Sequence, residues 1–198
     1  VWIAIRGVTC GPRTRLAAAF GLVAMMALPL LTGPAVDGVA RWIPLGPFAL
    51  HSGMLATPPL VVLAARDPRR GPIMLASAIA AAAFQPDAAT AFALFAAAAV
   101  LAAVTRRRLW IVTASAGVPA VVASLRVPGP APQTFVEGIV ADAWALQPLA
   151  ALALMLALVW PVIVLARGHE STRLPRLALS AALVVISLAG PYPVPFLG

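Results

Sequence analysis

The chain has 198 residues, of which 62% are hydrophobic and only 10% are charged, and its mean hydropathy is +0.99. A soluble domain with this composition would expose large apolar patches, so the sequence indicates an integral membrane protein. The formal net charge of +8 is carried by arginine, since the chain has no lysine. Because these arginines lie between apolar runs, they indicate membrane topology and not a nucleic-acid partner.

Cys10 is the single cysteine, which excludes an intrachain disulfide. The sequence has no Cys/His cluster with metal-ligand spacing, so the residues themselves predict no metal site and no cofactor. The first apolar run, Leu16 to Leu31, is long for a signal peptide and lacks a clean cleavage site. We therefore expect this run to remain in the protein.

The apolar segments predict an all-α, polytopic membrane protein that forms a single domain over residues 1–198. A helix needs roughly 20 apolar residues to cross a bilayer. The shortest segment, Pro72–Phe84, either crosses with the help of its flanking residues or is a half-embedded helix that breaks at Pro86. The seven predicted transmembrane helices are Leu16–Thr32, Phe48–Ala65, Pro72–Phe84, Ala88–Val104, Leu109–Leu125, Ala143–Ala166 and Leu177–Gly190.

The arginines predict the orientation of these helices. All except Arg41 and Arg126 lie before the first segment or in every second loop after it. Because positive charge marks cytoplasmic loops, we expect a cytoplasmic N-terminus and an outer C-terminus. The outer segments are then 33–47, 85–87, 127–142 and 191–198, and they contain Asp37, Asp87, Glu137 and Asp142.

Two outer segments contain polar islands broken by proline and glycine. The first runs from Gly38 to Phe48 and reads GVARWIPLGPF, and the second runs from Gln85 to Thr90 and reads QPDAAT. Ordinary membrane helices do not need such residues at their ends. The islands indicate a protein that handles a polar or anionic substrate at the bilayer surface.

Both islands resemble the SEDS family of cell-wall polymerases, the FtsW and RodA type. Family members carry G-x-x-R-W-I-x-L-G-x-F in an outer loop and Q-P-D-x-G-T above a later helix pair. Near the end of the chain, Pro193-Val194-Pro195-Phe196 is similar to the family's P-L-P-F. The resemblance covers nearly the whole chain and corresponds to the third to ninth of ten family spans.

The resemblance implies a multi-pass protein of the bacterial inner membrane that acts in cell division or cell shape. The family polymerises peptidoglycan strands from lipid II on the outer face, as an inverting glycosyltransferase. It usually does so with a divalent cation and a single-span class B transpeptidase partner. Lipid II or another polyprenyl-linked substrate, and membrane lipid, are therefore the expected partners.

The chain departs from the family where the family carries its chemistry. His51-Ser52-Gly53-Met54 stands in place of Q-P-S-E, so the acid is lost, and Thr57 replaces the lysine that follows. The resemblance places Thr134 at the position of the catalytic aspartate. The chain therefore resembles a shortened and divergent member of the family, or a fragment of one.

Several residues have both a functional and a structural interpretation. Arg41 can bind phosphate oxygens through bidentate contacts, or it can anchor the chain at headgroup level with Trp42. Asp87 can line a substrate groove, or it can simply begin a helix. The predicted substrate-binding residues are Arg41, Trp42, His51, Gln85, Asp87 and Thr90.

Glu137 and Asp142 are the candidates for a general base that would replace the missing aspartate. Asp142 has the simpler interpretation that it begins the sixth helix. Pro58-Pro59 is expected to break the second helix in the membrane, and Ala96 to Ala99 predicts close packing of the fourth helix.

Three functions remain open from the sequence. The first is a SEDS-like glycosyltransferase, and the second is a non-catalytic relative that acts as a scaffold of the cell-wall machinery. Thr134 and Thr57 favour the scaffold. The third is a transporter of lipids or small molecules, for which short, proline-broken spans are typical.

Overall fold

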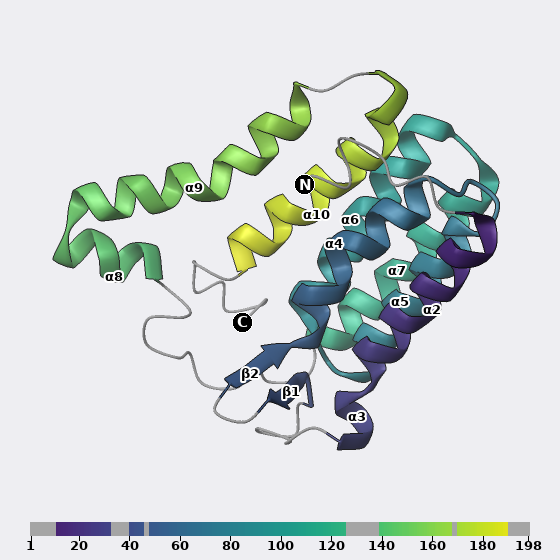
Figure 1. Ribbon diagram of the computed structural model, residues 1–198, viewed down its shortest axis with the longest axis horizontal. Coiled ribbons are helices and arrows are strands. Elements are labelled where there is room, and N and C mark those ends of the chain that lie inside the picture. Colours follow the sequence, from purple (N-terminus) through teal and green to yellow (C-terminus); the bar gives the residue numbers. More distant parts are fainter. Residues whose placement is uncertain (1–10, 33–39, 46–47, 126–138, 168–169, 190–198) are drawn as a thin grey trace.

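The computed structural model describes residues 11–32, 40–45, 48–125, 139–167 and 170–189 (Figure 1). These residues are mostly helical, as the composition predicts. Three helical stretches among them are long and apolar enough to cross a membrane, namely Pro12–Thr32, Ala88–Thr105 and Pro148–Leu165. Large apolar side chains face outward, such as Leu149, which is 82% exposed, and Leu156, which is 69% exposed. The chain is therefore a membrane protein.

The described elements follow one another along the chain, with a hairpin between the first helices and the rest. They are α2 (Pro12–Ala27), α3 (Pro29–Thr32), β1 (Trp42–Leu45), β2 (Phe48–His51), α4 (Ser52–Ala65), α5 (Gly71–Phe84), α6 (Ala88–Thr105), α7 (Arg108–Leu125), α8 (Ile139–Leu146), α9 (Pro148–Ala166), the 3-10 helix η1 (Glu170–Thr172) and α10 (Arg173–Ala189). The strands β1 and β2 pair in antiparallel fashion.

Helix α6 lies in the middle of the bundle and contacts α4, α5, α7 and α10. Its buried face is built from small side chains, and Ala91, Ala93, Ala97 and Ala98 have no exposed surface. Small residues allow helix backbones to approach closely where no water drives the helices together. The packing role predicted for the alanine run of this helix is confirmed at its central positions.

The helices of the bundle alternate in direction along the chain, so that the bundle has two chemically different ends (Figure 1). At the first end, Arg15 Nη1 donates a hydrogen bond of 3.3 Å to the carbonyl of Arg66, which joins the start of α2 to the end of α4. We call this the basic end, since α5 and α7 also begin beside arginines there. The hairpin lies at the opposite end, which we call the hairpin end (Figure 1).

The predicted helix from Phe48 to Ala65 is wrong at its start. Residues 48–51 form β2, because they pair with residues 42–45, and α4 begins only at Ser52. The prediction that Pro58-Pro59 breaks this helix is also wrong, since α4 continues through both residues. Each proline removes its own N–H donor and crowds the carbonyl four residues earlier, so the pair weakens α4 without ending it.

The predicted helix from Ala143 to Ala166 is divided in the structure. Gln147 has an extended backbone conformation and separates α8 from α9, because the residue before a proline is disfavoured in a helix. Helix α8 folds back along α9, and α9 contacts the bundle through α10 (Figure 1). Asp142 therefore lies within α8 and does not begin the long helix.

The remaining predicted helices are all present in the structure, although the ends of some differ. Helices α5, α6 and α7 match their predicted ranges closely, while α2 and α10 begin earlier than predicted, at Pro12 and Arg173. Proline suits the first turn of a helix, which explains the early start of α2. The same residue type at Pro29 interrupts the first predicted helix, because it cannot donate to the preceding turn.

Gly71, at the basic end, provides a test of how closely the helices of the bundle pack. A Cβ atom on Gly71 would lie 2.0 Å from the carbonyl oxygen of Ala64 and 3.0 Å from the Trp110 ring, whereas a Cβ on Gly21 would meet nothing within 4 Å. We expect Gly71→Ala to lower the stability by about 1–3 kcal/mol through overpacking. Gly21→Ala is the matched control and should be neutral or stabilising by up to about 1 kcal/mol. Thermal unfolding in detergent measures both, and equal stability of the two variants would contradict the packing at Gly71.

Candidate functional site

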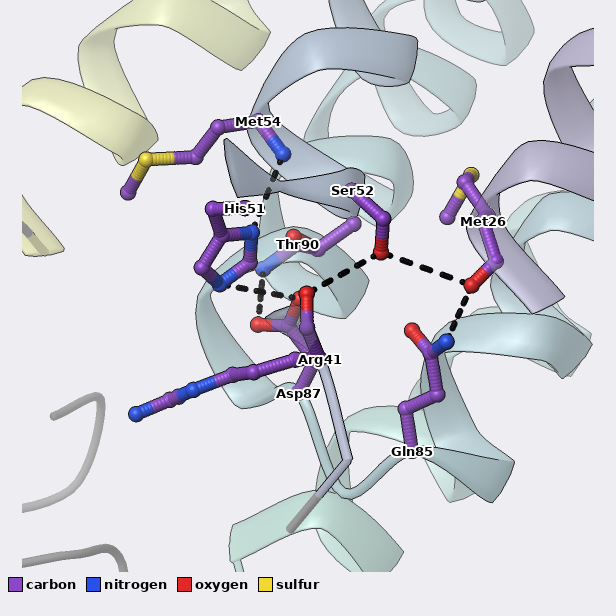
Figure 2. Close-up of polar contacts among 8 residues, drawn as sticks. All are labelled: Met26, Arg41, His51, Ser52, Met54, Gln85, Asp87 and Thr90. Atoms are coloured by element: carbon purple, nitrogen blue, oxygen red, sulfur yellow. Dashed lines mark hydrogen bonds and ion pairs between the residues drawn. The ribbon is translucent and has the colours of Figure 1, made fainter. Parts of the chain in front are cut away.

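The residues predicted to bind substrate come together at the hairpin end of the bundle (Figure 2). Trp42 and His51 are cross-strand partners, and their rings meet edge to face with centroids 5.1 Å apart. Gln85 follows the last residue of α5, and Asp87 is the N-cap of α6. The two polar islands of the sequence therefore form one cluster in the structure.

His51 and Asp87 face each other within this cluster. His51 Nδ1 accepts a hydrogen bond of 3.2 Å from the backbone N–H of Met54, so the ring proton of the neutral form is on Nε2. His51 Nε2 lies 3.6 Å from Asp87 Oδ2, slightly beyond direct hydrogen-bond distance. Asp87 Oδ1 accepts from the backbone N–H of Thr90 at 3.1 Å. His51 thus caps α4 through Nδ1, and Asp87 caps α6 through Oδ1. The second polar atom of each side chain faces the other residue.

The environment of His51 favours its neutral form. Burial lowers the pKa of His51 below its ordinary value of 6.5, although the charge of Asp87 acts in the opposite direction and raises it. The positive charge of Arg41 lowers the pKa further. This agrees with the hydrogen bond from Met54, which requires an unprotonated Nδ1.

Gln85 has a structural role that the sequence did not predict. Its Nε2 donates to the carbonyl of Met26, and Ser52 Oγ lies 3.4 Å from the same carbonyl and 3.2 Å from that of Arg41. Met26 lies in the last turn of α2, where carbonyl groups have no partner within the helix. Gln85 and Ser52 therefore tie α5 and α4 to the end of α2. Gln85 has no exposed surface, and its contact with substrate stays a prediction.

Gly53 sets the distance between α4 and α6 at the site. A Cβ atom on this residue would lie 2.3 Å from Thr90 Oγ1 and 2.7 Å from Asp87 Oδ2. By its resemblance to the SEDS family, Ser52-Gly53 belongs to the segment that has lost the acid of Q-P-S-E. In the structure, the small size of this pair allows His51 to reach Asp87. A small polar residue followed by glycine at the start of an apolar run was the sequence signal for this close approach.

Arg41 supplies a buried positive charge to the site. The residue is 9% exposed, and its Nε is buried without a hydrogen-bond partner in the described part of the chain. Figure 2 shows the side chain extending away from Ser52 and Gln85. A buried cation is normally paired, because leaving it unpaired in an apolar environment is costly. The guanidinium is therefore the group of this site that is best placed to bind an anion.

Of the two candidates for a general base, the structure describes only Asp142. Asp142 lies in α8, which packs on α9. Glu137 lies outside the described residues, as does Thr134, so the structure does not place either of them.

The divalent cation that the SEDS resemblance implies stays a prediction. His51 Nε2 and Asp87 Oδ2 supply two donors. No group of three His, Cys, Asp or Glu side chains lies together in residues 11–32, 40–45, 48–125, 139–167 or 170–189. Magnesium binds in an octahedron of oxygen ligands and usually takes one or two carboxylates from a protein. Among the described residues, Asp87 supplies the carboxylate of this site, and its Oδ1 caps α6 while its Oδ2 faces His51.

Comparisons of the chain with protein-family models, with curated proteins and with solved structures give no match. The resemblance to SEDS proteins therefore depends on the sequence motifs alone.

The His51–Asp87 pair predicts a specific dependence of stability on pH. Because the folded state lowers the pKa of His51, the unfolded state binds the proton more readily below about pH 6.5. We expect thermal stability in detergent to fall as the pH drops through about 6.5, and His51→Asn to reduce this fall. Asparagine keeps an acceptor for the Met54 N–H but does not titrate.

The second histidine of the chain provides the matched control for this measurement. His169→Asn removes the other imidazole of the chain, so the difference between the two variants isolates the part of the pH dependence that belongs to His51. If His51→Asn and the wild type lose the same stability as the pH is lowered, the assignment of a neutral, buried His51 is wrong.

Proposed function

We propose that this chain is a multi-pass protein of the bacterial inner membrane that binds a polyprenyl-linked pyrophosphate precursor of the cell wall. The SEDS resemblance implies lipid II as that precursor. The observation that carries the proposal is the buried Arg41, whose Nε has no partner among the described residues. A guanidinium forms short, charge-assisted hydrogen bonds to phosphate oxygens.

The position of Arg41 supports this substrate class over a soluble anion. Arg41 precedes Trp42 in the hairpin, and large exposed apolar side chains such as Leu50 and Leu55 lie beside the site in sequence. Trp and Arg are typical of the interface between headgroups and acyl chains. A ligand that combines a pyrophosphate with a long apolar chain would satisfy both kinds of surface.

The orientation that we propose places the hairpin end outside and the basic end in the cytoplasm, with seven spans. The structure supports an alternation of helix directions, and the arginine-rich turns after α4 and α6 lie at one end. Several spans are short, since the 14 residues of α5 would cover about 21 Å of a core of about 30 Å. These helices therefore need their flanking residues, or a locally thinner bilayer, to span.

Cysteine labelling in intact cells tests this orientation. In a Cys10→Ser background, Pro44→Cys places a thiol on the exposed hairpin, and Pro68→Cys places one on the exposed turn between α4 and α5. A membrane-impermeant maleimide should label the first variant in spheroplasts and the second only after permeabilisation. Labelling of both variants in spheroplasts would contradict an odd number of crossings between the two positions.

A non-catalytic role is favoured over polymerase activity by Thr134, because the SEDS resemblance places it at the position of the catalytic aspartate. A general base needs a free lone pair within reach of the substrate, and a threonine hydroxyl does not replace a carboxylate in this role. At the described site, His51 Nδ1 is occupied by the Met54 N–H, and the free oxygen of Asp87 faces His51. The second candidate function is therefore a scaffold that binds the precursor and presents it to other proteins of the cell-wall machinery.

Binding of fluorescent lipid II to the purified protein in nanodiscs tests the proposed function. We expect Arg41→Gln to weaken binding about 10- to 100-fold, the equivalent of about 1.4–2.8 kcal/mol for a charged hydrogen bond. Arg107→Gln removes an exposed arginine at the basic end and should bind like the wild type. Absence of binding by a folded wild-type protein would contradict the proposal.

The same preparation distinguishes the two candidate functions through polymerisation of lipid II. Glycan strands that disappear in Glu137→Ala or Asp142→Ala would indicate a polymerase with a relocated base. Binding that is sensitive to Arg41→Gln, without strands, would indicate the scaffold.

A further inference from the structure

A groove of about 290 Å³ runs between α2 and α5 on the outside of the bundle. This volume is just below the range of roughly 300–1,000 Å³ that small-molecule sites occupy. Its walls include Leu16, Phe20 and Val23 from α2 and Ile73 and Met74 from α5, with Arg70 at one end. The groove is therefore almost entirely apolar along its length and charged at one end.

The spacing of the lining residues gives the groove its shape. On each helix they recur three or four positions apart, so they form a single stripe along the helix axis. Both helices run away from the basic end, as the hydrogen bond from Arg15 to Arg66 fixes the start of α2 beside the turn that leads to α5. From Leu16 to Val23 the stripe covers about 10 Å. Phe20 and Ile73 are 66% and 68% exposed and form the rims.

The charged end of the groove has an arginine that is available to a ligand. The guanidinium of Arg70 has no hydrogen bond or ion pair with any residue that the structure describes, and Arg13 and Arg69 are also exposed at this end. The nearest acid in sequence, Asp67, uses Oδ1 to accept from the backbone N–H groups of Arg69 at 3.2 Å and Arg70 at 3.0 Å. Its carboxylate is thus directed toward the backbone of the turn.

We propose that this groove binds one acyl chain of an anionic phospholipid, with the lipid phosphate against Arg70. The apolar stripe matches a hydrocarbon chain that lies along the helices, and the arginine matches the charge of the headgroup. Basic pockets between membrane helices are suited to anionic lipid headgroups. A soluble anion would leave the stripe unused, and a neutral lipid would leave Arg70 without a partner.

This site is separate from the one described above. The groove begins at the basic end of α2 and α5, whereas Arg41 and His51 lie at the hairpin end. The inference depends on the protein being in a membrane and not on the cell-wall proposal, so either can fail without the other.

The lipid site is tested with the purified protein in nanodiscs of equal parts phosphatidylglycerol and phosphatidylcholine. Native mass spectrometry after release from the nanodisc counts the lipids that remain bound. We expect retention of phosphatidylglycerol over phosphatidylcholine, and a loss of about fivefold in that preference for Arg70→Gln. Ser77→Phe, which fills the groove from an exposed position on α5, should reduce retention of both lipids.

Two matched variants separate the groove from general effects of charge and bulk. Arg107→Gln removes an exposed arginine that does not line the groove, and Ala103→Phe adds a ring at an exposed position of α6. Both should retain phosphatidylglycerol like the wild type. Equal retention of the two lipids by the wild type, or equal losses in Arg70→Gln and Arg107→Gln, would overturn the proposal.

Discussion

The backbone groups at the ends of the helices must find hydrogen-bond partners inside a largely apolar protein, and the hairpin end is arranged around this constraint. The Met26 carbonyl of α2 accepts from Gln85, with Ser52 beside it, and the first turns of α4 and α6 donate to His51 and Asp87. In hydrocarbon, each unsatisfied backbone group costs several kcal/mol. The polar islands are therefore, first of all, the caps that allow three short helices to meet.

Because of this constraint, the residues of the site differ in which of their polar atoms remain available to a ligand. Both nitrogens of His51 are directed to protein groups, and Asp87 has one free oxygen, which faces His51. A general-base role for His51 would require the loss of its cap or a change of tautomer. Arg41 is different, because its backbone carbonyl accepts the hydrogen bond from Ser52, while the Nε of its side chain has no partner among the described residues. Binding can therefore use Arg41 without destabilising the helix ends.

The sequence predicted the helices best where local signals mark both ends. Asp87 caps α6, and the arginines after Thr105 end it, so its range was predicted almost to the residue. The hairpin was missed because Ala49 and Leu50 continue an apolar run, and hydropathy does not contain the strand pairing between Leu50 and Ile43. The motifs predicted which residues gather at the site, but not that Gly53 and Ser52 hold them together.

Helix α2 connects the two sites that the structure suggests. Its last turn provides the Met26 carbonyl to Gln85 and Ser52, while its first turns line the apolar groove beside Arg70. Helix α2 packs on α4 and α5, and both ends of the contact are fixed by hydrogen bonds, from Arg15 at one end and to Met26 at the other. The same helix thus contributes its first turns to the groove and the Met26 carbonyl of its last turn to Ser52, whose hydroxyl also lies beside the Arg41 carbonyl and which follows His51 in the chain.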